Sequence, residues 1–205
     1  MKNKNSKTIL LFICMSVFAV CAEASLYNDS AAMAGFTNKT SFDISMMGSV
    51  LKVDVEYAVY APGNYPGLDI SGHSEYVYAY QVFNKSQSNV AVDFFSVGIL
   101  PGCSIDSVYT DTSYGTVGGA VPFAFHFPQS AGFVFISNAL NPKQWSDVLL
   151  FTSIYSPTMG LGTVSGGGLG VMGSLPTPSI VPEPATILII APILYLLRNK
   201  KIRTK

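Results

Sequence analysis

Residues 50–60 have the sequence VLKVDVEYAVY, and this stretch decides the fold class. Apolar side chains occupy every second position and charged ones stand between them: Leu51, Val53, Val55, Tyr57 and Val59 against Lys52, Asp54 and Glu56. A period of two places the two sets on opposite faces of an extended chain. The stretch therefore predicts a β-strand with one buried and one solvated face.

Other short apolar and aromatic stretches follow the same pattern. They occupy residues 76–83, 90–97, 104–109, 121–127, 133–137 and 148–155, with Gly, Pro, Asn and Ser gathered in the gaps. The turn-like composition of residues 84–89 predicts a hairpin that joins 76–83 to 90–97. Between residues 40 and 160, no apolar period of 3.6 is long enough to predict a helix. We therefore predict an all-β domain over residues 25–161, an antiparallel β-sandwich of the Ig-like or jelly-roll kind whose strand order stays open.

The charge of this domain differs from that of the whole chain. The formal charge of the chain is zero, but eight of its twelve Lys and Arg residues lie in the two terminal segments. Residues 25–180 hold four basic and ten acidic residues, a net charge of −6. An acidic domain lacks the cationic surface that neutralises phosphates, so we expect no nucleic-acid partner.

The first 24 residues have the pattern of a signal peptide. Three lysines precede an apolar run over residues 9–20, which is too short to span a bilayer comfortably. Ala22 and Ala24 then supply small side chains three positions and one position before a cleavage point. We predict export by the signal-peptide route, with signal peptidase cutting after Ala24. A lipoprotein signal with Cys21 as the lipidated residue is the alternative.

The composition changes again after residue 161. Residues 162–180 are rich in Gly and then in Pro, and we interpret them as a flexible and then extended linker. Val181-Pro182-Glu183-Pro184 comes next, followed by an apolar run over residues 185–197. As a helix this run measures roughly 20 Å, against a hydrocarbon core of about 30 Å, so it predicts one marginal transmembrane helix. A basic cluster at the chain end predicts a cytoplasmic C-terminus, and consists of Arg198, Lys200, Lys201, Arg203 and Lys205.

The order of motif, apolar run and basic end resembles the PEP-CTERM sorting signal of exported bacterial proteins. The resemblance covers residues 180–205, and the sorting motif within it is Val181 to Pro184. It implies that an exosortase, an integral-membrane enzyme, recognises the motif and releases or transfers the domain. It also implies passage through the inner membrane, a final place at the cell surface or in the extracellular matrix, and exopolysaccharide as a candidate partner. A permanently anchored protein with a proline-rich stalk is the alternative.

No catalytic pattern emerges from the domain. The sequence around Ser74, GHSEY, departs from a nucleophile elbow because Tyr76 stands where the second glycine belongs. Two histidines and one cysteine without ligand spacing do not predict a zinc site, and the acidic residues match no EF-hand loop. We therefore expect no enzymatic activity, no metal and no cofactor.

The tyrosines provide a candidate ligand-binding signal. Tyr76, Tyr78 and Tyr80 share one face of a predicted strand, so they are either buried together or displayed together as a stacking surface for sugar rings. The only tryptophan, Trp145, is predicted to pack in the core. Three functions follow from the sequence: a structural or adhesive surface protein is favoured, a lectin-like carbohydrate-binding module is the alternative, and a polysaccharide-degrading enzyme would need a pair of carboxylates.

Overall fold

The computed structural model describes residues 25–116 and 118–180, so the predicted signal peptide and sorting tail lie outside the described residues. Within this part of the chain, one 3-10 turn, η1 (Leu26–Asn28), precedes ten strands. The strands form two five-stranded sheets in which every neighbouring pair is antiparallel. The prediction of an all-β fold is confirmed.

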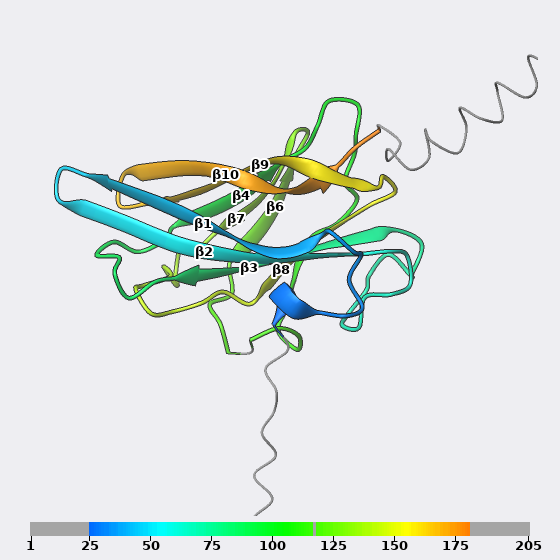
Figure 1. The fold of residues 1–205 in the computed structure, drawn as a ribbon, viewed down its shortest axis with the longest axis horizontal. Helices are drawn as coiled ribbons and strands as arrows, with labels where there is room; N and C mark the ends of the chain where they lie inside the picture. Colours follow the sequence, from blue (N-terminus) through cyan, green and yellow to red (C-terminus); the bar gives the residue numbers. More distant parts are fainter. Residues whose placement is uncertain (1–24, 117, 181–205) are drawn as a thin grey trace, which may run out of the picture.

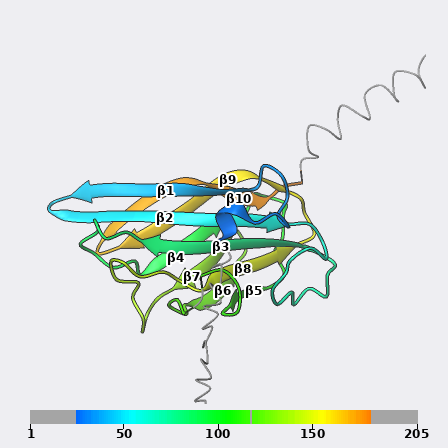
Figure 2. The ribbon, with the colours of Figure 1, turned by 60° about the horizontal axis from the view of Figure 1, so that its bottom comes forward.

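The two sheets lie on each other as layers (Figures 1 and 2). The first sheet has the strand order β1 (Thr37–Met46), β2 (Ser49–Tyr60), β3 (Tyr76–Asn84), β8 (Val148–Ser153), β5 (Val108–Asp111). The second sheet has the order β10 (Leu169–Pro178), β9 (Pro157–Gly166), β4 (Phe94–Gly98), β7 (Ser130–Val134), β6 (Phe123–Phe127).

The core lies between the sheets. In β2 the apolar side chains Leu51, Val53 and Val55 are buried, whereas the charged side chains between them remain partly exposed, as the alternation predicts. The second sheet contributes Phe95 and Phe133 to the same apolar cluster. Contact between these two sets of side chains makes the molecule a β-sandwich.

The predicted hairpin over residues 76–97 is wrong. Residues 76–84 form β3 in the first sheet, but β4 begins at Phe94 in the second sheet. Both edges of β3 are already taken, one by β2 and the other by β8, so no place beside β3 is left for β4. The Asn84 side chain holds the connection between the two sheets in place: its amide donates to the carbonyls of Val90 and Leu140 at 3.0 and 2.7 Å.

The predicted linker over residues 162–180 is also wrong. These residues form the end of β9 and the whole of β10, a hairpin in the second sheet. The turn consists of Gly167 and Gly168, both with positive φ (58° and 79°), as a tight two-residue hairpin requires. The domain therefore extends to residue 180 and does not end at residue 161.

The glycines and prolines of this segment are compatible with a β-hairpin because of their positions in the two strands. A Cβ at Gly162 would lie 2.3 Å from Cδ1 of Leu175, so the absent side chain makes room for a buried leucine. Pro176 and Pro178 lie in β10, which is an edge strand. An edge strand has one row of backbone N–H groups that needs no partner strand, so proline is tolerated there.

A second apolar cluster covers the outer face of the first sheet. It joins Leu26 of η1 and Tyr65 of the β2–β3 loop to sheet residues such as Val77 and Leu150. Figure 1 shows η1 on the side of the first sheet that faces away from the second. The hydroxyls of Tyr60 and Tyr114 both donate to the Asp29 carboxylate, and these hydrogen bonds hold the N-terminal segment against the first sheet. β8 is buried along its whole length because both of its faces are covered.

Candidate functional site

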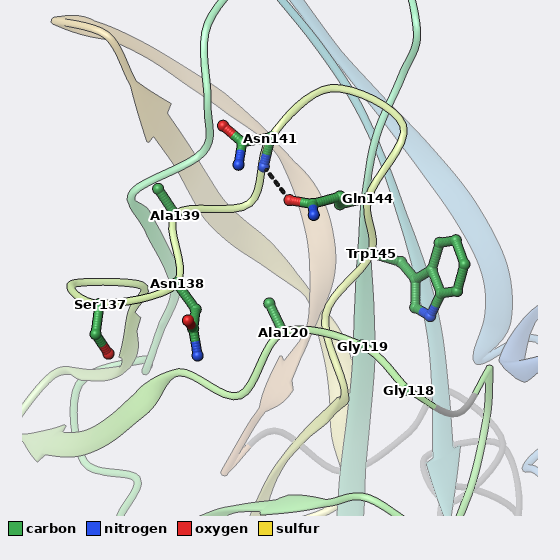
Figure 3. Close-up of a pocket in the computed structure, with 9 residues that line it drawn as sticks. All are labelled: Gly118, Gly119, Ala120, Ser137, Asn138, Ala139, Asn141, Gln144 and Trp145. Atoms are coloured by element: carbon green, nitrogen blue, oxygen red, sulfur yellow. Dashed lines mark hydrogen bonds between the residues drawn. The ribbon is translucent and has the colours of Figure 1, made fainter.

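A cleft of about 600 Å³ opens between two loops near the start of β6 (Figure 3). One wall is the segment that leads into β6, and the other is the loop between β7 and β8. The lining residues are Gly118, Gly119, Ala120, Ser137, Asn138, Ala139, Asn141, Gln144 and Trp145.

The first wall is held by backbone hydrogen bonds. The N–H of Ala120 donates to the carbonyl of Trp145 at 2.8 Å, and the N–H of Asp147 donates to the carbonyl of Ala120 at 3.0 Å. Gly119 lies so close to the segment before β8 that a Cβ there would stand 2.3 Å from the carbonyl carbon of Ser146. Only glycine fits at this position without movement of the backbone.

The second wall is the loop over residues 137–145. Leu140 anchors it, since its N–H and carbonyl exchange hydrogen bonds with Val92 at 3.0 and 2.9 Å. The side-chain oxygen of Gln144 accepts from the N–H of Asn141 at 2.8 Å, and the dashed line in Figure 3 marks this bond. The bond fixes the orientation of the Gln144 amide, which leaves its NH₂ group as a donor on the cleft side.

The lining side chains are neutral. Three amides (Asn138, Asn141 and Gln144), one hydroxyl (Ser137) and one indole (Trp145) supply its polar groups. In Figure 3 the Trp145 indole and the Asn138 amide lie on opposite sides of Ala120. These groups can bind a neutral polar molecule by hydrogen bonds and by contact with an aromatic ring. A glycoside hydrolase uses two carboxyl groups across the scissile bond, and none belongs to this lining.

Asp147 lies behind the first wall and is almost fully buried. Burial raises the pKa of its carboxyl, and a hydrogen bond from the N–H of Gly119 opposes part of that rise. The carboxylate thus supports the glycine segment and leaves the open side of the cleft to neutral groups.

Of the two alternatives for Tyr76, Tyr78 and Tyr80, burial is the one that the structure shows, and these tyrosines form no stacking surface for sugar rings. Tyr78 and Tyr80 are completely buried, and Tyr76 is half-buried against the core. The ring of Tyr78 stacks on Phe151 at 4.7 Å between centroids, and the hydroxyl of Tyr80 donates to the carbonyl of Pro176 at 2.6 Å. These tyrosines face the second sheet, because the covered outer face of the first sheet belongs to the alternate residues of β3.

The prediction that Trp145 packs in the core is wrong. It is half-buried and lines the cleft instead of filling the core. The sequence contained a signal for a binding segment here, because the nine residues 137–145 combine the only tryptophan with three amide side chains.

Two carboxylates outside the cleft have unusual surroundings. Asp111 is buried, and its oxygens accept from the hydroxyl of Tyr65, the N–H of Leu68 and both the N–H and hydroxyl of Ser113. Burial raises the pKa of Asp111, but the hydrogen bonds outweigh burial and hold this pKa below its ordinary value.

Glu75 has the opposite balance. It is 7% exposed, and its Oε2 has no hydrogen-bond partner. Burial raises the pKa of Glu75, the Thr152 hydroxyl opposes the rise, and the nearby Asp106 and Asp69 add to it. Within residues 25–116 and 118–180, no group of three His, Cys, Asp or Glu side chains is arranged to hold a metal ion.

Known proteins give no further guide to this cleft. No protein-family model, curated protein or solved structure matches the chain. Within the described ranges, no helix has the length and apolar character needed to cross a membrane. The cleavage residues Ala22 and Ala24, the motif Val181 to Pro184, the apolar run over 185–197 and the basic cluster all lie outside those ranges.

Proposed function

We propose that this chain is an exported, non-enzymatic protein of the cell surface or extracellular matrix, sorted by an exosortase through residues 181–205. The observation that carries the proposal is the place where the folded domain ends. The N–H of Ser179 still donates to the carbonyl of Ser156 at 2.9 Å, and the Val-Pro-Glu-Pro motif begins two residues later. A complete domain directly followed by a short motif, an apolar run and a basic end is the order that the sorting resemblance requires.

The finer fold supports a surface role, and we infer an Ig-like arrangement. Seven strands in chain order, β2, β3, β4, β5, β8, β9 and β10, occupy the positions of strands A to G of a constant-type Ig domain. β2, β3, β8 and β5 correspond to its A-B-E-D sheet, and β10, β9 and β4 to its G-F-C sheet. β1 and the β6–β7 hairpin extend the two sheets. Many cell-surface domains share this architecture, which by itself does not specify a ligand.

Intact-mass measurement tests the sorting proposal. The full chain is expressed in cells with an active exosortase, and the protein is recovered from cell and medium fractions. We expect masses that lack residues 1–24 and the C-terminal tail. Glu183→Ala should retain Lys205, because the motif is lost, whereas Ile180→Ala, just outside the motif, should be processed normally. Wild-type protein that retains Lys205 in membranes would contradict sorting and favour the permanent anchor.

A second function rests on the cleft. Because its lining combines neutral amides, a hydroxyl and an indole, we propose that the cleft binds a neutral sugar unit, which makes the domain lectin-like. An exopolysaccharide is the candidate polymer.

Glycan-array binding tests this function. Trp145→Ala and Gln144→Ala should each weaken binding about tenfold, since each removes one stacking or hydrogen-bonding contact of about 1.4 kcal/mol. Ile154→Ala, a truncation of another exposed side chain away from the lining, serves as the control. Wild-type protein that binds no glycan on the array, or variants that bind as well as wild type, would remove the proposal.

A further inference from the structure

The cleft between residues 118–120 and 137–145 has more hydrogen-bonding groups than its own loops use. Within residues 25–116 and 118–180, no hydrogen bond is formed by the Ser137 hydroxyl or by the side-chain amides of Asn138 and Asn141. Each of these amides can donate and accept at the same time. The cleft therefore suits a ligand group that is itself both a donor and an acceptor.

Ala120 gives the cleft an apolar point. Both of its backbone groups are used, because its N–H donates to the carbonyl of Trp145 and its carbonyl accepts from the N–H of Asp147. Only the methyl group of Ala120 is left for a ligand. In Figure 3 this methyl group points into the space between the Asn138 and Gln144 amides. The lining thus places one apolar group among polar ones.

Gln144 is the polar group whose orientation is fixed. Its Oε1 accepts from the N–H of Asn141 at 2.8 Å, so Nε2 is the atom that a ligand can use, and Nε2 is a donor. A ligand at this point must bring an acceptor. Next to it, the Ala120 methyl requires an apolar group, because a polar group held there loses hydrogen bonds to water without replacing them.

The charged groups near the cleft disfavour an ionised ligand. The Asp147 carboxylate is buried behind residues 118–120 and accepts from the N–H of Gly119. Lys143 belongs to the loop over residues 137–145 but is not part of the lining. A sugar with a carboxylate would therefore meet no cation in the lining, and a sugar with a free ammonium would meet no carboxylate there. The ligand that fits is neutral.

An acetamido group meets all of these requirements in one substituent. It carries an N–H donor, a carbonyl acceptor and a methyl group, and it has no charge. Its carbonyl can accept from Nε2 of Gln144, its N–H can donate to the amide oxygen of Asn138, and its methyl group can pack against Ala120. A sugar that bears only hydroxyls would place a polar group against the Ala120 methyl and would lose the apolar contact.

We propose that the sugar unit bound in the cleft is an N-acetylated hexosamine, recognised through its acetamido group by Ala120, Asn138 and Gln144. This inference rests on the proposed lectin-like function of the cleft and names the class of sugar. The cleft volume of about 600 Å³ lies in the usual range for small-ligand sites, so the sugar ring has room beside the acetamido group. The Trp145 ring belongs to the same lining and offers an aromatic contact to the sugar ring.

Isothermal titration calorimetry with two matched tetrasaccharides tests the inference, with protein purified from cells that express the full chain. Fully N-acetylated chitotetraose and cellotetraose share the same β-1,4-linked backbone and differ only in the acetamido group or hydroxyl at C2. We expect chitotetraose to bind about tenfold or more tightly than cellotetraose, because it adds a buried methyl group and a hydrogen bond.

Two substitutions in the cleft remove the proposed contacts separately. Gln144→Glu replaces the Nε2 donor by an acceptor of the same shape, and Ala120→Ser replaces the apolar contact by a hydroxyl. Each should lower the preference for chitotetraose over cellotetraose about fivefold or more. Gln87→Glu and Ala34→Ser make the same two changes at exposed positions outside the lining and are the matched controls.

The outcomes separate this inference from the lectin-like function itself. A preference for chitotetraose that falls in the cleft variants and not in the controls, all with wild-type circular dichroism and Tm, supports the proposal; if one cleft variant does not fold, the other decides. Equal binding of the two tetrasaccharides overturns the proposal but leaves a lectin of another specificity. A preference that the folded cleft variants retain also overturns it, because the acetamido group is then recognised elsewhere.

A wild-type protein that binds neither tetrasaccharide is compared on a glycan array with N-acetylgalactosamine and galactose, another pair that differs only in the acetamido group. The same preference in this pair supports the proposal. Binding to sugars without an acetamido group and to none with one overturns it. Absence of binding to any glycan removes the lectin-like function together with this inference.

Discussion

Leu175→Ala tests whether residues 162–180 belong to the folded domain. Leu175 is completely buried, and its side chain occupies the space that Gly162 leaves open in the paired strand. Truncation of a buried leucine to alanine costs about 2–5 kcal/mol, because it removes apolar contacts and leaves a cavity. In a domain of this size each kcal/mol lowers Tm by about 2–4 °C, so we expect a fall of about 5–15 °C.

Met172→Ala provides the matched control. Met172 lies three residues earlier on the same strand, on the opposite face, and is 69% exposed. Its truncation should change stability by no more than about 0.5 kcal/mol. Thermal unfolding followed by far-UV circular dichroism measures both variants against wild type. If residues 162–180 were a tether outside the fold, the two variants would unfold at the wild-type temperature, and that result would refute the assignment of β10.

Three further substitutions test buried polar groups. Asp111→Asn should lower the free energy of unfolding by about 1–3 kcal/mol at pH 7. The folded pKa of Asp111 lies below its ordinary value of 3.8, so the stability that the carboxylate adds to wild type is lost as pH falls below 3.8. The unfolding free energies of the two proteins should therefore converge in acid, and an unchanged difference would contradict the reasoning. Glu75→Gln should raise Tm at pH 7 but not at pH 4, because the folded pKa of Glu75 is raised and wild type loses stability as pH rises above 4.5. Equal Tm values of the two proteins at pH 7 would count against an uncompensated negative charge on Glu75. Tyr80→Phe should cost about 1–2 kcal/mol in urea unfolding through loss of the hydrogen bond to Pro176, and a neutral result would show that this bond adds nothing.

Local patterns predicted individual strands well. The alternation in residues 50–60 matches β2 (Ser49–Tyr60), and the apolar stretch over 148–155 matches β8 (Val148–Ser153). Both signals come from residues of one strand, so no distant part of the chain is needed to interpret them. β1 (Thr37–Met46) carries no such signal, because as an edge strand it buries only Phe42.

Predictions that depended on strand pairing failed. Whether residues 76–84 pair with residues 90–97 depends on β2 and β8, which occupy both edges of β3. The same limit applies to the tyrosines, because a row on one face of a strand is buried or exposed according to the side chains that pack on that face. The cleft brings together segments about 20 residues apart, Gly118–Ala120 and Asn138–Trp145, and so could not be seen in either segment alone.

By itself the sequence determined that the domain is made of strands and that it is acidic, since each of these properties belongs to neighbouring residues or to composition; the export signals predicted at the two ends of the chain rest on the same kind of local pattern. Only the tertiary structure decided that a Gly- and Pro-rich segment is a hairpin, that η1 and two loops cover the outer face of the first sheet, and that Trp145 lines a cleft. The physical reason is that burial depends on partners distant in the chain. Glycine is suited equally to a flexible tether and to a close contact, and only the Leu175 side chain that packs against Gly162 distinguishes the two.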